Sequence, residues 1–299
     1  MIIVLAARPR LRACRMRSRR GFLLRARTWL GQTLPRAAKG GPWARAGAAA
    51  AVALGLLIGL ASPAPTLSSD ALPGIIGMDN RAPERSRTLP WSAIGRVNRE
   101  TGGFCTGVLV GSRMALTAAH CLWNRRTNRW IPTDALHFVA GWRGGPNLGH
   151  AKVIEVRAAP GLRFDLSGKP VRYADDWALL VLDDALGDSV GSVPILSLDP
   201  AAAMTFAARQ DVIEAAGYNQ DKPHLLYRQN ACRLFGTESG GRLLIHDCDL
   251  TRGASGAPIM FERDGRYAVI GVQIAVLRRA GEDRGLAVIP SMSSARPVN

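Results

Sequence analysis

Short apolar runs separated by turn residues fill the chain from Ile75 onward, and this pattern constrains the fold more than any other feature. The runs have the length and β-branched content of strands, and Gly, Asn, Asp and Pro stand between them. Typical runs are WSAIGRV, LHFVAGW, AKVIEVRA, WALLVL and YAVIGVQIAVL. Helical patterns are scarce, and DPAAAMTFAAR is the best helix candidate. The pattern predicts an all-β body, arranged as a sandwich or as one or two small barrels.

Positive charge is concentrated at the start of the chain. The 299 residues contain 39 Lys and Arg against 23 Asp and Glu, but residues 1–45 hold eleven Arg, Lys39 and no acidic residue. The remainder has 27 basic and 23 acidic groups, which is a nearly balanced surface. This balance argues against nucleic-acid binding by the body of the protein.

An uncharged apolar run of 16 residues, 46–61, follows the basic segment. It is short for a membrane span and has the length of a signal-peptide core, with small residues that permit cleavage near Ala61. The same run could instead stay as a weak membrane anchor. We therefore expect a leader over 1–61, a linker or pro-segment over 62–74, and a secreted or periplasmic domain over 75–299.

Four cysteines lie in the expected exported body, which is the usual setting for disulfides. They allow three pairings, and equal spacings of sixteen positions favour Cys105–Cys121 and Cys232–Cys248. The alternative is a metal site built from His120–Cys121 and the HDC sequence of His246 and Cys248. No CxxC or HxxxH spacing supports it, so no metal is expected.

The sequence TRGASGAPI, residues 251–259, places Ser255 among glycines where neither helix nor strand gains from them. This can be a flexible surface turn, or a nucleophile whose small neighbours let a substrate carbonyl approach the backbone. In the second case the N–H groups of Gly253 and Ser255 would stabilise a developing oxyanion, and Gly256 would permit a sharp turn.

A serine nucleophile needs a histidine to take its proton and a carboxylate to hold that histidine. His120, in ALTAAHCL, follows a strand-like run and precedes a cysteine that would fix its backbone. Asp176 opens DWALLVL and would be buried as it enters the sheet. Asp165, Asp183 and Asp184 are the alternatives, whereas Asp175 is expected only to end a turn in solvent.

These three segments resemble the trypsin-like (chymotrypsin-fold) serine endopeptidases. FCTGVLVGSRMALTAAHC is similar to the histidine block of that family, DDWALLVL to its aspartate block, and GASGAPI to its serine block. GIIGMDNR and CDLTRGASGAP look closest to the bacterial glutamyl-endopeptidase-like branch. The resemblance spans roughly residues 75–290.

The resemblance implies two six-stranded antiparallel β-barrels, about 84–187 and 188–290, with the active site in the cleft between them. It also implies roles for four positions. His120 would be the general base, Asp176 the acid that orients it and Ser255 the nucleophile, while Gly253 and Ser255 match the oxyanion-hole positions.

Two positions bear on specificity, and a third departs from the family pattern. Asp249 matches the place where trypsins carry the aspartate that selects Lys or Arg, and Gln273 matches a position where the glutamyl-specific branch uses histidine. The alternative is that Asp249 caps a loop and Gln273 pairs within a strand. Ala254 stands where the animal enzymes have the aspartate that binds a newly freed amine, so that activation switch cannot operate in its usual form, although trimming near Ile75 stays possible.

The leading hypothesis is an exported serine endopeptidase that acts on protein or peptide substrates through an acyl-enzyme, as a monomer and without a cofactor. A catalytically silent secreted binding protein of the same fold is the alternative. Membrane association is expected only through an uncleaved leader, and nucleic acid is not expected as a partner.

Overall fold

The computed structural model describes residues 72–279 and 282–298. The expected leader, residues 1–61, and most of the expected linker lie outside the described residues, so their boundaries stay predictions. Within the described part of the chain, the longest α-helix has nine residues, and none could cross a bilayer.

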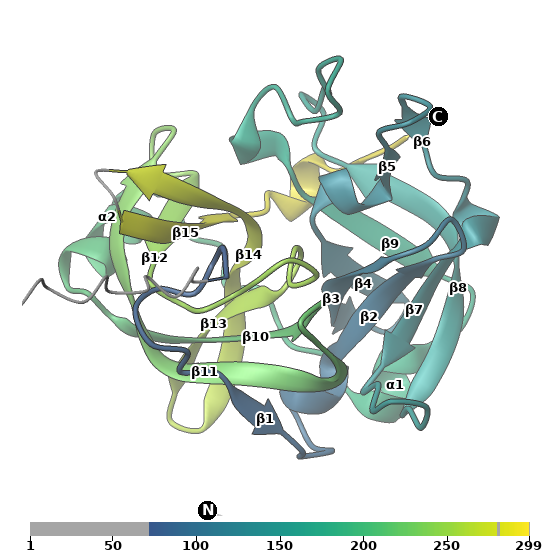
Figure 1. The fold of residues 1–299 in the computed structure, drawn as a ribbon, viewed down its shortest axis with the longest axis horizontal. Coiled ribbons are helices and arrows are strands. Elements are labelled where there is room, and N and C mark those ends of the chain that lie inside the picture. Colours follow the sequence, from purple (N-terminus) through teal and green to yellow (C-terminus); the bar gives the residue numbers. More distant parts are fainter. Residues whose placement is uncertain (1–71, 280–281, 299) are drawn as a thin grey trace, which may run out of the picture. The chain divides into compact units, whose positions relative to one another are not determined.

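Six strands between residues 94 and 182 form a closed antiparallel barrel, which we call barrel 1 (Figure 1). Neighbouring strands pair in the order β8-β7-β2-β3-β4-β9, and β9 pairs with β8 to close the sheet. Their bounds are β2 Ile94–Arg99, β3 Phe104–Gly111, β4 Met114–Thr117, β7 Leu136–Ala140, β8 Gly149–Ala158 and β9 Ala178–Leu182.

Six strands between residues 212 and 288 form barrel 2. Their order is β10-β13-β14-β15-β12-β11, and β11 pairs with β10 to close the sheet. Their bounds are β10 Val212–Asn219, β11 Lys222–Glu238, β12 Leu243–His246, β13 Pro258–Arg263, β14 Arg266–Arg279 and β15 Glu282–Val288. The double barrel implied by the resemblance is thus confirmed, and the expected limits of the two barrels enclose these strands.

One further short strand at each end of the described body pairs with the barrel that is more distant in the sequence. β1 (Ala82–Glu84) precedes barrel 1 but pairs with β11 of barrel 2. β16 (Arg296–Pro297) follows barrel 2 but pairs with β8 of barrel 1. The two ends of the described body therefore tie the barrels together.

The remaining elements are short. The predicted helix is confirmed as α2 (Pro200–Ala208), which has proline in its first turn and Asp199 as N-cap, accepting a hydrogen bond of 2.7 Å from the Ala202 N–H. The other elements are α1 Leu186–Val190, β5 Trp123–Asn124, β6 Arg129–Trp130, and the 3₁₀ turns η1 Trp91–Ala93, η2 Ala119–Leu122, η3 Thr133–Ala135, η4 Tyr173–Asp175 and η5 Met292–Ser294.

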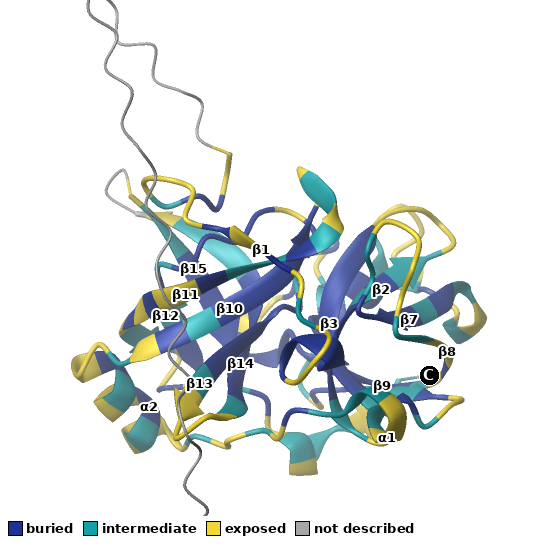
Figure 2. Cartoon of the chain, turned by 90° about the horizontal axis from the view of Figure 1, so that it is seen from below, coloured by how far each residue is buried: buried dark blue, intermediate teal, exposed yellow. Residues whose placement is uncertain are grey.

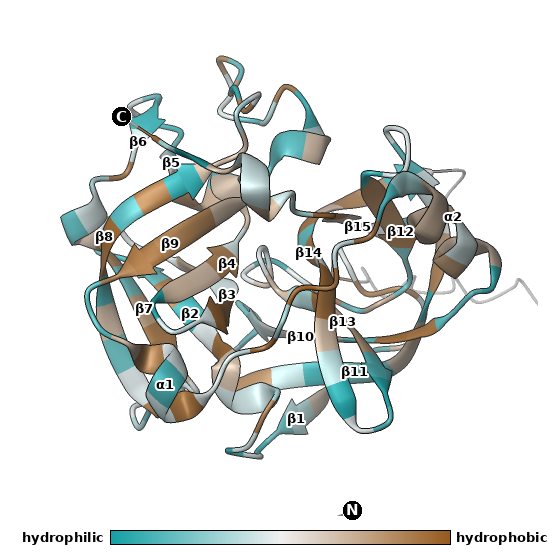
Figure 3. Cartoon of the chain, turned by 180° about the vertical axis from the view of Figure 1, so that it is seen from behind, coloured by the Kyte–Doolittle hydropathy of each residue, from teal (hydrophilic) through white to brown (hydrophobic). Residues whose placement is uncertain are grey.

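Strand periodicity explains which side chains fill the barrels. In β8, Ala151 and Val153 point inward, a register shift follows, and Val156 and Ala158 then point inward with the phase moved by one residue. The strands are largely buried and the connecting loops exposed (Figure 2), and β9 is apolar along its whole length (Figure 3). A rigid apolar core in each barrel is what positions the loops between them.

Candidate active site

His120 lies in η2, directly after β4, with Ala118 and Ala119 completely buried beside it. The next residue, Cys121, lies at disulfide distance from Cys105 in β3, with 2.07 Å between the sulfur atoms. Cys232 and Cys248 lie 2.00 Å apart, so the pairs are those that the equal spacing favoured. The imidazole is therefore attached to a segment that is packed and cross-linked, as a general base requires.

Asp176 is completely buried behind His120. Its Oδ2 atom lies 2.7 Å from His120 Nδ1, and its Oδ1 atom accepts a hydrogen bond of 2.8 Å from the His120 backbone N–H. One carboxylate thus fixes both the backbone and the ring. Because a carboxylate only accepts, the geometry assigns the ring proton to Nδ1 and leaves Nε2 available as an acceptor.

The other aspartates considered from the sequence lie elsewhere. Asp175 is buried and forms ion pairs with Arg172 and Arg242, so it does not end a turn in solvent. The remaining three are exposed, namely Asp165, Asp183 and Asp184.

Ser255 lies in the loop between β12 and β13, and two glycines set the path of that loop. Gly253 and Gly256 have φ of +94° and +82°, the left-handed region that favours glycine. A Cβ on Gly256 would lie 2.2 Å from the Thr106 carbonyl oxygen and 2.3 Å from Thr117 Oγ1. No side chain fits there, so glycine is what lets the serine loop of barrel 2 press against barrel 1.

Along this loop, backbone N–H groups that donate a hydrogen bond alternate with ones that have no acceptor in the described part of the chain. Those of Ala254 and Gly256 donate to the carbonyl oxygens of Thr251 and Gln273, at 3.0 Å and 2.7 Å. Those of Gly253 and Ser255 have no acceptor within the part of the chain that the structure describes. Two unpaired donors beside a serine hydroxyl can bind an anionic oxygen.

Thr106 of β3 holds this loop, and sequence reasoning missed it. Its hydroxyl donates to the Gly253 carbonyl oxygen at 3.1 Å and accepts from the Tyr218 N–H at 2.9 Å. Its N–H donates to the Ser255 carbonyl oxygen at 2.9 Å. Threonine is common in strands, so no signal in the sequence marked this one.

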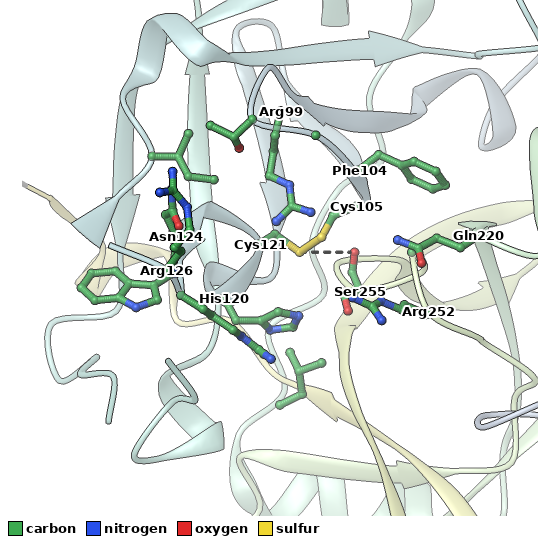
Figure 4. Close-up of a pocket in the computed structure, with 17 residues that line it drawn as sticks. Arg99, Phe104, Cys105, His120, Cys121, Asn124, Arg126, Gln220, Arg252 and Ser255 are labelled. Atoms are coloured by element: carbon green, nitrogen blue, oxygen red, sulfur yellow. Dashed lines mark hydrogen bonds between the residues drawn. A yellow bond between two sulfur atoms is a disulfide. The ribbon is translucent and has the colours of Figure 1, made fainter. Parts of the chain in front are cut away.

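His120, Gly253 and Ser255 line one cavity of about 650 Å³, together with the Cys105–Cys121 disulfide. The imidazole points toward Ser255 across this cavity (Figure 4). The cavity therefore brings together a hydroxyl, an oriented imidazole and two free N–H donors, which are the groups that acyl transfer needs.

A second cavity of about 440 Å³ adjoins the first at Ser255. Its walls are mainly apolar and come from Leu250, from Ile274 to Val276 in β14, and from Leu72 and Pro73. Gln273 also lines it. The Gln273 amide nitrogen donates to the Ala275 carbonyl oxygen at 2.7 Å, so this side chain is held in place rather than free.

His246 contacts the Gln273 side chain and helps to hold it in place. Its Nε2 atom lies 2.7 Å from Gln273 Oε1, and its Nδ1 atom accepts a hydrogen bond from the Cys248 N–H, which assigns the ring proton to Nε2. Complete burial lowers the pKa of His246 to about 4 from the usual 6.5, so the ring is neutral.

Asp249 does not line either cavity at the serine. It is completely buried, and its two carboxylate oxygens accept hydrogen bonds from the backbone N–H groups of Ile76 and Asn80, at 2.7 Å and 2.8 Å. This arrangement favours the alternative role considered from the sequence, in which Asp249 caps a loop. Burial is the main cause of a raised Asp249 pKa, and the two N–H groups act against it.

Ion pairs also hold the segment of residues 76–81, whose Ile76 and Asn80 contact Asp249. The buried Arg81 guanidinium contacts the carboxylates of Asp79 and Asp221, at 2.8 Å and 2.7 Å. Arg81 holds the pKa of Asp79 well below its usual range. Residues 76–81 are thus fixed to barrel 2 next to Leu72 and Pro73, the two residues of this segment that line the second cavity.

No group of three or more His, Cys, Asp or Glu side chains among residues 72–279 and 282–298 is arranged to hold a metal ion. The cysteines in this part of the chain are paired with one another, while His120 contacts Asp176 and His246 contacts Gln273.

Comparison with known proteins agrees with this geometry. A structure of a Glu endopeptidase in complex with MPD shares the fold, with a TM-score of 0.60 and 19% sequence identity, over 73% of this chain and 95% of that one. No curated protein sequence matches. The model of the trypsin-like peptidase domain matches residues 105–272, which is more than half of the chain. The chain therefore belongs to the family of trypsin-like peptidase domains.

Proposed function

We propose that this protein is an exported serine endopeptidase in which Ser255 attacks the scissile carbonyl of a peptide. His120 Nε2 takes the hydroxyl proton and returns it to the leaving amine, and Asp176 stabilises the imidazolium that forms. The N–H groups of Gly253 and Ser255 bind the oxyanion of each tetrahedral intermediate. Water then releases the acyl group in the same way.

The observation that carries this proposal is the two-point hold of Asp176 on His120, in a cavity that His120 shares with Ser255. A buried carboxylate that fixes both the N–H and the ring of a histidine leaves one nitrogen facing the cavity. A histidine with only a structural role would not need an available acceptor beside a serine and two unpaired N–H donors.

Export is supported by the two cysteine pairs and by the expected signal-peptide core at residues 46–61. Disulfides persist in oxidising compartments, so a secreted or periplasmic location fits both features. Sequencing the N-terminus of the mature protein tests this step. A terminus shortly after Ala61 would support export with cleavage, and an intact leader would point to an anchor.

A fluorophosphonate probe tests the chemistry directly. We expect it to label the processed protein at Ser255 and nowhere else, because only an activated serine reacts readily. Ser255→Ala should lower peptidase activity by a factor of about 10⁴ or more while the thermal unfolding midpoint stays unchanged.

Ser197→Ala is the matched control, since Ser197 is exposed and lies outside both cavities at the site. It should keep both labelling and activity. Absence of labelling in the folded wild type would reject the proposal and leave a catalytically silent binding protein of the same fold.

A further inference from the structure

Four arginines line the cavity that contains His120 and Ser255: Arg99, Arg125, Arg126 and Arg252. They come from three separate segments, namely the end of β2, the turn between β5 and β6, and the loop before Ser255. Among the residues that the structure describes, no Asp or Glu lines this cavity. Positive charge therefore gathers here, although the body as a whole is nearly balanced.

These four arginine side chains have no counter-charge within the part of the chain that the structure describes. None of them takes part in an ion pair or a side-chain hydrogen bond with another described residue. Some arginines elsewhere contact carboxylates, namely Arg81, Arg157, Arg172, Arg209, Arg228, Arg242, Arg278 and Arg284. Others, such as Arg85, Arg87 and Arg129, are exposed to solvent. What distinguishes the four is that they lie together around one cavity.

Arg99 shows the electrostatic cost of this arrangement. It is half-buried, and Figure 4 shows its guanidinium pointing into the cavity. Burial lowers its pKa, and the positive charges of Arg252 and Arg125 lower it further. Its Nε–H is buried without an acceptor, and so is the Nε1–H of Trp123 in the same lining. Both groups are donors only, so the ligand chemistry that would satisfy this region is an anionic acceptor.

The position of the cavity says which part of a substrate meets these arginines. In acyl transfer the histidine donates its proton to the leaving amine, so the leaving half of the peptide lies on the His120 side of Ser255. That side is the arginine-lined cavity, bounded by the Cys105–Cys121 disulfide and Phe104. The largely apolar second cavity, on the β14 side of Ser255, is left for the acyl half.

We propose that the arginines of this cavity select peptides that carry Asp or Glu in the first few positions after the scissile bond. This inference rests on the proposed function and names its substrate class. Arg99 lines only the leaving-half cavity, and Arg252 lies where the two cavities adjoin, since it lines both; these two would meet the residues nearest the cut. Arg125 and Arg126, which are exposed, would meet the residues that follow. Guanidinium groups suit this task because they bind carboxylates through paired N–H donors.

Three fluorogenic peptides with one common acyl half test the proposal. The common half is taken from the best-cleaved member of a peptide library, and the leaving halves begin with Glu-Asp-Glu, Gln-Asn-Gln or Lys-Lys-Lys. We expect kcat/KM for the acidic peptide to exceed that for the neutral one by about tenfold or more at low salt, since hydrogen bonds to charged groups are the strong ones. The ratio should shrink as NaCl is added.

Variants locate the effect. Arg99→Gln and Arg126→Gln should each bring the acidic-to-neutral ratio toward one. Arg126→Glu, a reversal at an exposed residue that should not disturb folding, should shift preference toward the lysine peptide. Arg87→Gln is the matched control, because Arg87 is exposed and lies outside both cavities, and it should keep the wild-type ratio.

Fluorophosphonate titration separates this inference from the proposed function. If the probe labels Ser255 but the three peptides are cleaved equally, or none is cleaved, acidic selection is wrong and the peptidase assignment stands on its own. An acidic-to-neutral ratio that stays at the wild-type value in both Arg99→Gln and Arg126→Gln would also overturn the inference. So would inhibition by a heparin fragment of an enzyme that shows no preference among the three peptides. If the probe labels nothing, both proposals fail together.

Discussion

Asp176, just before β9 of barrel 1, and Asp249, just after β12 of barrel 2, make an instructive pair, because both are completely buried carboxylates. Asp176 accepts from one backbone N–H and from an imidazole. Asp249 accepts from two backbone N–H groups, both in the segment that precedes barrel 1. One therefore orients a side chain that can move a proton, whereas the other fixes a stretch of chain.

The difference teaches that burial of a carboxylate does not by itself identify a functional group. A carboxylate paired with backbone N–H groups contributes structure, because those donors never change protonation. A carboxylate paired with imidazole is linked to a titratable ring, so its loss changes the tautomer available to the serine. The partner decides the role.

The largest effect expected from this comparison is that of Asp176→Asn. The asparagine side chain can donate to His120, which favours the wrong tautomer, and kcat should fall by about 10⁴ while the unfolding midpoint changes little. Steady-state kinetics with a peptide substrate and thermal unfolding measure the two quantities. Asp184→Asn, at an exposed aspartate just after β9, is the matched control and should leave both unchanged. Near-normal turnover in Asp176→Asn would contradict the assigned role.

The pH dependence of stability should come next in size, through the buried His246, which contacts Gln273 of the second cavity. Its folded pKa of about 4 lies under the usual 6.5, so the unfolded chain binds the proton more readily. Stability from this group is complete above pH of about 6.5 and is lost as the pH falls toward 4, by up to about 3 kcal/mol.

Urea unfolding at pH 7 and pH 4.5, in the wild type and in His246→Gln, isolates this contribution. The variant should lose less stability between the two pH values than the wild type does. The comparison between wild type and variant is needed because the raised pKa of Asp249 makes the folded state more stable as the pH falls, which opposes the effect of His246. Parallel losses in the two proteins would show that His246 does not stay neutral.

The smallest effect should come from Asp249→Asn. Its amide can accept from one of the N–H groups of Ile76 and Asn80 but presents a donor to the other, which should cost about 2 kcal/mol of unfolding free energy. Relief of the buried charge offsets part of that cost. Turnover should change far less than in Asp176→Asn, and urea unfolding beside kinetics shows the contrast. A loss of kcat as large as that of Asp176→Asn would remove the distinction between the two aspartates.

Particular residues show how far the sequence carried the interpretation. The apolar runs indicated strands, and DPAAAMTFAAR indicated α2, because proline and an aspartate cap act within a few residues of the helix start. The spacing of the cysteines favoured the pairs that the structure contains. Asp249 shows the limit, since its position in the motif matched a specificity residue while its partners, Ile76 and Asn80, lie some 170 positions away.

The sequence by itself determined the all-β body, the cysteine pairs that were favoured and the three segments that carry the candidate triad, because strand periodicity, turn chemistry and short motifs are local properties of a chain. Tertiary structure alone decided which buried aspartate contacts the histidine, which N–H groups stay unpaired and where the arginines gather. Those features depend on how segments far apart in sequence meet across two closed barrels, and no local pattern encodes the distances between them.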